Sequence, residues 1–196
     1  LISILAGAII IALMGYLDDR YNLNPYLRIG LGFIAAYLPI SAGIGISFLT
    51  NPFGGIIDLS NPIISDIFAL IWIVFMMNML NMGAKGVDGQ LTGVTIISAL
   101  TITALSFFYS ADITQWSVII LTSITAGAYL GFLPWHKFPQ KIMPGYGGST
   151  LAGYLLAIAS ILSTTKVGTL IVVLGIPLID TGYVVLRRVL SGKSPV

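Results

Sequence analysis

Long apolar stretches alternate with short polar joints along the whole chain. Each stretch approaches the ~20 apolar residues that a helix needs to cross a hydrocarbon core of roughly 30 Å. Seven such stretches occur, with ends defined to a few residues: 1–16, 29–49, 64–80, 91–110, 116–133, 149–163 and 167–187. The pattern predicts an all-α fold, a polytopic transmembrane helical bundle of about seven spans.

Composition supports a membrane protein. Charged residues are 8% of the 196 residues, hydrophobic residues are 57%, and the mean hydropathy is +0.99. A soluble domain of this size needs far more charge to cover its surface. A net charge of +2 without a basic stripe argues against nucleic acid as a partner. The absence of cysteine excludes disulfides and thiolate metal sites.

Residues 1–196 are predicted to form one domain, because the joints contain no linker, repeat or low-complexity tract. The chain opens at Leu1 inside an apolar run, without a Met or a basic segment before it. This favours a fragment of a longer protein over a signal peptide.

The charges test the number of spans. Seven spans place 17–28, 81–90, 134–148 and the tail from 187 on one side, and 50–63, 111–115 and 164–166 on the other. Eight of the nine Lys and Arg residues fall on the first side, and only Lys166 falls on the second. Such a bias predicts that the first side is cytoplasmic.

The first candidate site is the pair Asp18-Asp19, which follows Gly15 at the cytoplasmic end of the first span. Adjacent carboxylates repel each other, and they lie here at the negative end of a helix dipole, which costs stability. A cation ligand, a shared proton or a nearby arginine would offset the cost. A plain solvated cap is the alternative interpretation.

The second candidate site is the joint at 78–90. It carries two asparagines, Lys85, Asp88 and three glycines between two apolar spans. Glycine permits close approach of a ligand to the backbone, and the N–H groups that begin the next helix attract anions. Turn geometry alone is the alternative explanation of this composition.

The third candidate site runs from 131 to 150. Its glycine run, followed by Ser149 at a helix start, is a plausible phosphate cradle. Lys137, Lys141 and His136 would add positive charge around it, although a lone histidine is more often structural or interfacial.

Asp180 lies within an otherwise apolar span. An intramembrane carboxylate is either a functional candidate or half of a buried pair. Arg187 follows two helical turns later, roughly 10 Å along the axis, so a structural ion pair or hydrogen bond is the favoured interpretation.

Together the joints indicate an anionic, phosphorylated ligand at the cytoplasmic membrane surface. Phosphoryl transfer needs charge neutralisation and positioning more than covalent help from the protein. Mg²⁺ uses one or two carboxylates together with substrate phosphates. Asp18, Asp19 and Asp88 could supply those carboxylates.

The four regions described above, in this order along the chain, resemble the polyprenyl-phosphate N-acetylhexosamine-1-phosphate transferases (glycosyltransferase family 4), which include the phospho-MurNAc-pentapeptide translocase. Residues 15–19 are similar to the paired aspartates of that family, and residues 85–89 to its nucleotide-contacting loop. Residues 131–136 are similar to Gly-Phe-Leu-x-x-Asn and residues 145–149 to Gly-Asp-x-Gly-Ser. Residues 177–195 resemble the stretch that leads to a cytoplasmic His-rich loop.

The resemblance implies that a lipid phosphate oxygen attacks the β-phosphate of a UDP-sugar such as UDP-GlcNAc. A polyprenyl-diphosphate sugar forms for cell-wall or surface-glycan synthesis, and UMP leaves. Asp18 would bind or deprotonate the lipid phosphate, with Asp19 and Asp88 as further catalytic carboxylates and the expected Mg²⁺ ligands. The expected substrate-binding residues are Arg28, Asn81, Lys85, Gly86, His136, Lys141, Gly145, Tyr146, Gly148 and Ser149.

The chain departs from the family pattern at three positions. Lys85 replaces the first aspartate of the nucleotide loop, His136 replaces an asparagine, and Tyr146 replaces the aspartate that resembles the principal Mg²⁺ ligand. A tyrosine phenol is neutral near pH 7. Two alternatives are open: Lys85 could partly replace a cation by pairing directly with phosphate, or Asp19 and Asp88 could instead hold a shifted metal.

The departures at Lys85 and Tyr146 favour an alternative, a relative that binds lipid phosphate or nucleotide-sugar without turnover. A transporter or channel is disfavoured, because the polar residues crowd one end of the spans. The expected location is the cell membrane, with several spans and a cytoplasmic active face. A homodimer is compatible with the sequence.

Overall fold

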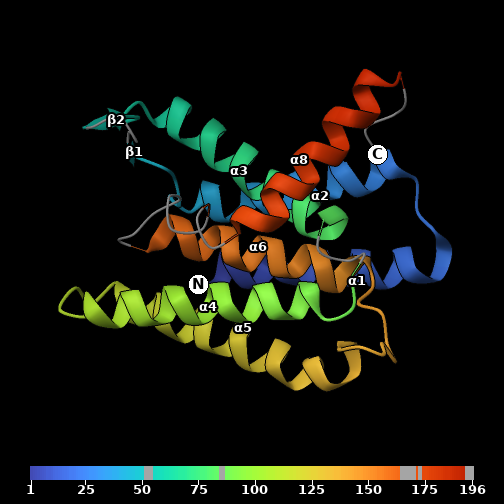
Figure 1. The fold of residues 1–196 in the computed structure, drawn as a ribbon. Helices are drawn as coiled ribbons and strands as arrows, with labels where there is room; N and C mark the ends of the chain where they lie inside the picture. Colours follow the sequence, from blue (N-terminus) through green and yellow to red (C-terminus); the bar gives the residue numbers. More distant parts are fainter. Residues whose placement is uncertain (51–54, 84–86, 164–170, 172–173, 193–196) are drawn as a thin grey trace.

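The structure is a computed structural model that describes residues 1–50, 55–83, 87–163, 171 and 174–192. Its helices are α1 (Ile2–Tyr21), α2 (Pro25–Ser41), α3 (Pro62–Gly83), α4 (Gln90–Phe108), α5 (Gln115–His136), α6 (Tyr146–Leu162) and α8 (Gly175–Leu190) (Figure 1). The predicted site residues Lys85 and Gly86 lie outside the described residues, and so does the side chain of Asp180. The predicted all-α fold is confirmed.

Most of the predicted spans coincide with an observed helix, whereas the span expected at 167–187 lies partly outside the described residues and α8 covers only its later part. Helices α3, α4, α5 and α6 match four predicted spans, with both boundaries within three residues of the predicted ones. These spans were expected at 64–80, 91–110, 116–133 and 149–163. Helix α1 continues past the predicted end at 16 as far as Tyr21. The span expected at 29–49 is wrong in extent, because α2 begins at Pro25 and ends at Ser41.

The apolar residues after α2 form a strand instead. Gly43 adopts φ 88, a left-handed conformation that stops the helix. β1 (Phe48–Thr50) then pairs antiparallel with β2 (Ile56–Asp58), with Phe48 opposite Asp58. Figure 1 shows this hairpin at the opposite end of the bundle from the turn between α1 and α2.

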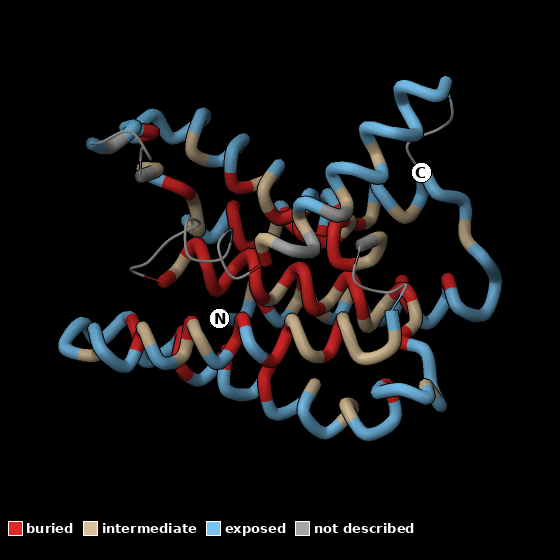
Figure 2. Tube along the Cα trace, viewed as in Figure 1, coloured by how far each residue is buried: buried red, intermediate tan, exposed pale blue. Residues whose placement is uncertain are grey.

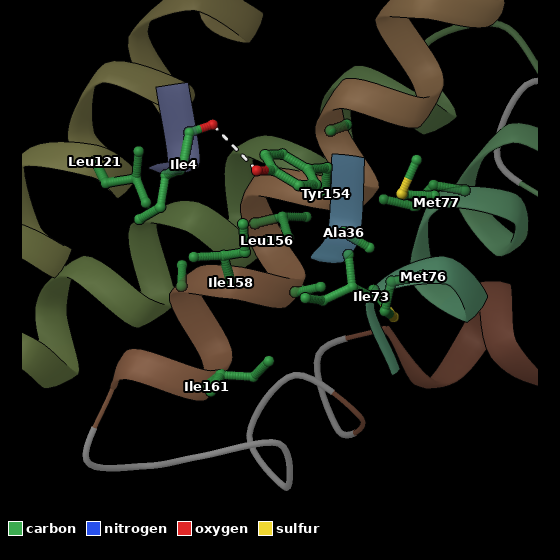
Figure 3. Packing of buried hydrophobic residues seen from close by; sticks show 14 of the residues in the cluster. Ile4, Ala36, Ile73, Met76, Met77, Leu121, Tyr154, Leu156, Ile158 and Ile161 are labelled. Atoms are coloured by element: carbon green, nitrogen blue, oxygen red, sulfur yellow. Dashed lines mark hydrogen bonds between the residues drawn. The ribbon is translucent and has the colours of Figure 1, made fainter. Parts of the chain in front are cut away.

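Helix α6 lies at the centre of the bundle and carries much of its core. It packs against α1, α3, α4 and α5, and Figure 2 shows it buried along most of its length. Tyr154, Leu156 and Ile158 are fully buried. The Tyr154 hydroxyl donates to the backbone oxygen of Ile4 at 3.1 Å (Figure 3). Buried polar groups need partners where water is absent, so this bond helps to fix α1 against α6.

Four of the described helices, α1, α3, α4 and α5, are long and apolar enough to cross a membrane. Helices α2 and α6 have 17 residues and α8 has 16, fewer than the ~20 that a full crossing needs. Large apolar side chains face outward, among them Ile2, Ile9 and Ile124, which are 86%, 59% and 66% exposed. Such a surface suits lipid rather than water, and the protein is a multi-pass membrane protein.

Three joints that are distant in the sequence lie at one end of the bundle. In Figure 1 the α1–α2 turn, the start of α4 and the α5–α6 joint lie together, opposite the hairpin, and α8 runs toward the same end. We call it the basic end, because it holds the described cations Arg20, Arg28, Lys137, Lys141, Arg187 and Arg188. For the described residues, the predicted one-sided distribution of cations is confirmed.

Candidate active site

The site begins where the end of α1 meets the start of α6. A methyl group added at Gly15 would lie 2.1 Å from the Cα of Gly147. Only two facing glycines allow this approach, as is common where transmembrane helices cross closely. The crossing brings the acidic end of α1 to the first turn of α6.

Asp18 is buried, at 8% exposure, and both of its carboxylate oxygens are engaged. Oδ2 lies 3.1 Å from Nη1 of Arg28, and Oδ1 accepts a hydrogen bond from the backbone N–H of Leu23 at 3.0 Å. The tight turn between the helices makes this pair. Asn22 adopts φ 49 at the end of α1, and the Asn24 side chain caps α2 by accepting from the N–H of Tyr26. The sequence predicted that a cation ligand, a shared proton or a nearby arginine offsets the repulsion between Asp18 and Asp19. The structure shows the arginine, Arg28.

Asp19 caps the N-terminus of α6. Its Oδ1 accepts from the backbone N–H of Tyr146 at 3.1 Å. A carboxylate is favourable at the positive end of a helix dipole, which offsets the cost of its place at the end of α1. Gly145 makes room for the carboxylate, because a Cβ there would lie 1.9 Å from Asp19 Oδ2. The two adjacent aspartates therefore have different partners on different helices.

Arg28 lies over the ring of Tyr146. The guanidinium carbon is 5.0 Å from the ring centroid, a distance at which the aromatic face attracts a cation. Tyr146 is 6% exposed, whereas the Arg28 side chain is 24% exposed. Tyr146, which replaces the aspartate of the family pattern, thus contacts Arg28, the cation expected to bind phosphate.

Asn81, Gly148 and Ser149 connect α3 and α5 to the start of α6. The Ser149 hydroxyl, fully buried, lies 2.7 Å from Asn81 Oδ1 and donates to it. The Tyr129 hydroxyl of α5 donates to the backbone oxygen of Gly148. The sequence did not single out Tyr129, because a tyrosine in an apolar span is usually an interfacial anchor. Both contacts hold the first turn of α6 in place.

Asp88 joins the start of α4 to the α5–α6 joint. Its Oδ2 accepts from the backbone N–H of Gln140 at 3.0 Å. The side-chain amide of Gln140, turned so that its N–H₂ group faces the carboxylate, also donates to Asp88 Oδ1 at 3.0 Å. Gln140 was missed in the sequence, where it has no signal beyond being polar among cations. The contact brings the second and third predicted sites together.

His136 and Lys141 lie in different environments, one buried and one exposed. His136 is fully buried, its Nδ1 lies 3.0 Å from the Thr92 hydroxyl, and its ring stacks on Phe132. Within the described residues its Nε2 has no hydrogen-bond partner. This setting favours the structural interpretation of the histidine. Lys141 is exposed, with its Nζ 5.7 Å from the centroid of the Trp135 ring.

The described carboxylates offer few ligands for Mg²⁺. No group of three His, Cys, Asp or Glu residues in the described part of the chain could hold a metal. Both oxygens of Asp18 are engaged, and so are both oxygens of Asp88, whereas Oδ2 of Asp19 accepts no hydrogen bond from any described residue. Because Mg²⁺ needs one or two carboxylates when phosphates complete its shell, this donor set suits a metal that arrives with substrate.

An apolar groove of about 430 Å³ runs beside the polar cluster between α5 and α6. Its lining includes Tyr129, Phe132, Met143 and Gly145. Gly145 borders both this groove and the Asp19 carboxylate. The arrangement can receive an amphiphilic ligand, with its charged group at the helix ends and its apolar part along the groove.

Fold and site together define a multi-pass membrane protein with carboxylates, a guanidinium and helix N-terminal amides gathered at one end. The sequence pattern of the family described as Glycosyl transferase family 4 matches residues 1–164. The chain belongs to this family.

Curated relatives agree with this assignment. The chain is 29% identical over 209 residues to a Bacillus subtilis protein named "Probable undecaprenyl-phosphate N-acetylglucosaminyl 1-phosphate transferase", with 99% of this chain and 54% of the relative covered. It is 28% identical over 220 residues to a decaprenyl-phosphate N-acetylglucosaminephosphotransferase of Mycolicibacterium smegmatis, covering 98% and 52%. It is 30% identical over 195 residues to a phospho-N-acetylmuramoyl-pentapeptide-transferase of Streptococcus uberis, covering 94% and 56%. The chain spans about half the length of these relatives.

Proposed function

We propose that the protein transfers a sugar-1-phosphate from a UDP-sugar, UDP-GlcNAc or a similar one, to a polyprenyl phosphate. The products are a polyprenyl-diphosphate sugar and UMP. The observation that carries the proposal is the convergence of three joints on one polar cluster, through the contacts Asp19–Tyr146, Asn81–Ser149 and Asp88–Gln140. The names of the relatives, which specify transfer to undecaprenyl or decaprenyl phosphate, support it.

The reaction makes modest demands on the protein. An oxygen of the lipid phosphate forms a bond to the β-phosphorus of the donor, and the bond from that phosphorus to the oxygen of UMP breaks. A phosphate monoester with a second pKa of about 6 is largely ionised at neutral pH, so the nucleophile needs no proton removed. The site must neutralise charge and align the two phosphates. Arg28 and the N–H groups at the start of α6 other than that of Tyr146, which is bonded to Asp19, are the proposed donors.

The engaged oxygens of Asp18 favour a role in holding Arg28 over the predicted role as a base. Asp19 remains the proposed Mg²⁺ ligand, with one oxygen that accepts no hydrogen bond from a described residue. Asp88 is proposed as the second ligand, and it would have to give up a hydrogen bond from Gln140 to bind the metal. A bound Mg²⁺ would neutralise the donor diphosphate. Lys85, Gly86 and Lys141 remain proposed contacts of the nucleotide-sugar.

The proposed location is the cell membrane, with the basic end at the cytoplasmic face. The excess of cations at that end supports this orientation. There a soluble nucleotide-sugar can meet a lipid phosphate held at the membrane surface. A homodimer remains a prediction.

The test uses the full-length protein in detergent with a polyprenyl phosphate and a panel of radiolabelled UDP-sugars, with Mg²⁺ or with EDTA. We expect UMP release with at least one sugar, and a loss of that release in EDTA. If no sugar gives UMP while polyprenyl phosphate still binds, the non-catalytic alternative replaces the enzyme. Equal turnover in EDTA would remove Mg²⁺ from the proposal.

A further inference from the structure

Arg28 is held from two sides by groups that are themselves fixed. Its Nη1 is paired with Asp18, which the backbone N–H of Leu23 holds in turn. Its guanidinium lies over Tyr146, whose own N–H is bonded to Asp19. A long arginine side chain normally loses rotamer entropy when it binds a ligand, and this setting removes much of that loss in advance.

The remaining donors of Arg28 are available. A guanidinium carries five N–H donors, and within the described residues only Nη1 donates to a protein atom. The side chain is 24% exposed, whereas the side chain of Asp18 is 7% exposed. The outward part of this pair is therefore the planar fork of N–H groups, which matches two oxygens of a phosphate.

We propose that Tyr146 is a positioning residue that, beside the ion pair to Asp18, holds Arg28 as the phosphate-binding cation of the site. The ligand chemistry is a phosphate, either that of the polyprenyl phosphate or the diphosphate of the UDP-sugar. This inference rests on the proposed function for the identity of those ligands. The ring supplies the contact, so the tyrosine works here through its aromatic face rather than through its hydroxyl.

The charges around Arg28 favour phosphate binding through directed hydrogen bonds over binding through a large net positive charge. The Asp18–Arg28 pair is neutral as a whole, so the phosphate gains directed hydrogen bonds from fixed donors more than a large net charge. The N-terminus of α6 adds a partial positive charge to the same cluster, and the Asp19 carboxylate that caps it adds an opposing negative charge. A divalent cation that arrives with substrate would add further charge without replacing the guanidinium.

The experiment measures kcat and the KM of each substrate, together with binding of polyprenyl phosphate alone and of UDP-sugar alone. The variants are Tyr146→Leu, Tyr146→Phe and Arg28→Gln, and the double variant that combines Tyr146→Leu with Arg28→Gln. The matched control is the Arg20–Tyr21 pair, an exposed arginine 5.6 Å over a tyrosine ring at the same end of α1. Thermal unfolding of each variant checks that it is folded.

We expect Tyr146→Leu to weaken affinity for one of the two phosphates about three- to thirty-fold, the range of a cation–π contact. Tyr146→Phe keeps the ring and should stay within about twofold of the wild type. On the Arg28→Gln background, Tyr146→Leu should add little, because the contact that it removes is already lost. Tyr21→Leu should change neither affinity. The substrate whose KM rises identifies the source of the phosphate.

Three results from the variants would overturn the proposal. Equal losses in Tyr146→Phe and Tyr146→Leu would assign the role to the hydroxyl, and full additivity with Arg28→Gln would show that the two residues act separately. Unchanged affinities in a folded Tyr146→Leu protein would show that the ring positions nothing. If the wild type releases no UMP, the proposed function fails, and the binding measurements still decide the role of Tyr146. A wild type that binds neither phosphate would overturn both.

Discussion

The crossing of α1 and α6 can be tested by adding one methyl group. In a Gly15→Ala variant the new Cβ would lie 2.1 Å from Cα and 2.5 Å from N of Gly147. These are backbone atoms, so no side chain can rotate away. Ordinary contact begins at 3.4 Å, so the two helices must separate by roughly 1 Å or more. Overpacking of this kind costs about 1–3 kcal/mol.

The displacement also separates the groups of the candidate site, because Asp18 and Asp19 lie on α1 while Tyr146 starts α6. A misplacement of about 1 Å can cost on the order of 10²-fold in rate. We therefore expect Gly15→Ala to lower both the unfolding temperature in detergent and, by about 100-fold, the rate of UMP release. The reciprocal Gly147→Ala places its Cβ at a milder 3.0 Å from Gly15 Cα and should lose less of each.

Gly127→Ala is the matched control. Nothing lies within 4 Å of the added methyl group on α5, and alanine is the better helix former by about 1 kcal/mol, so this variant should be at least as stable as the wild type. The reasoning is refuted if Gly15→Ala and Gly127→Ala have the same unfolding temperature and the same activity.

Three further variants test individual contacts, each by thermal unfolding and UMP release. Gly145→Ala should displace the Asp19 carboxylate from the start of α6 and cost about 0.5–2 kcal/mol as a lost cap; a wild-type melting curve would contradict this. Tyr154→Phe removes the bond to the backbone of Ile4 and should cost about 1 kcal/mol while kcat stays unchanged, and a large loss of kcat would show that α1 is placed differently. Asp88→Ala leaves the N–H groups of the facing joint unpaired and should lower both stability and turnover, so full activity would separate Asp88 from the site.

The helices and the one-sided charge were predictable, because apolar length and the distribution of Lys and Arg are local signals. The end of α2 was not, since the apolar run after Ser41 is equally compatible with a helix or with a strand, and Gly43 together with pairing to β2 decided the outcome. Periodicity cannot separate these states in a short apolar run.

The members of the candidate site were predictable as residues but their partners were not. Asp19 and Tyr146 are 127 positions apart in the sequence, and their contact depends on how closely α1 and α6 cross. The burial of His136 against Thr92 depends in the same way on the packing of α4 and α5. Gln140 contacts Asp88 through its backbone N–H, which every residue except proline carries, and through a side-chain amide that has no distinctive spacing in the sequence.

The most direct test of the central claim is UMP release by the full-length protein and by its Arg28→Gln variant, with polyprenyl phosphate and UDP-sugars. We predict that the wild type releases UMP only when both substrates are present. Loss of charged hydrogen bonds worth about 1.5–3 kcal/mol should lower kcat/KM of the variant by roughly ten- to a hundredfold. A wild type that releases no UMP, or a variant as active as the wild type, would contradict the account.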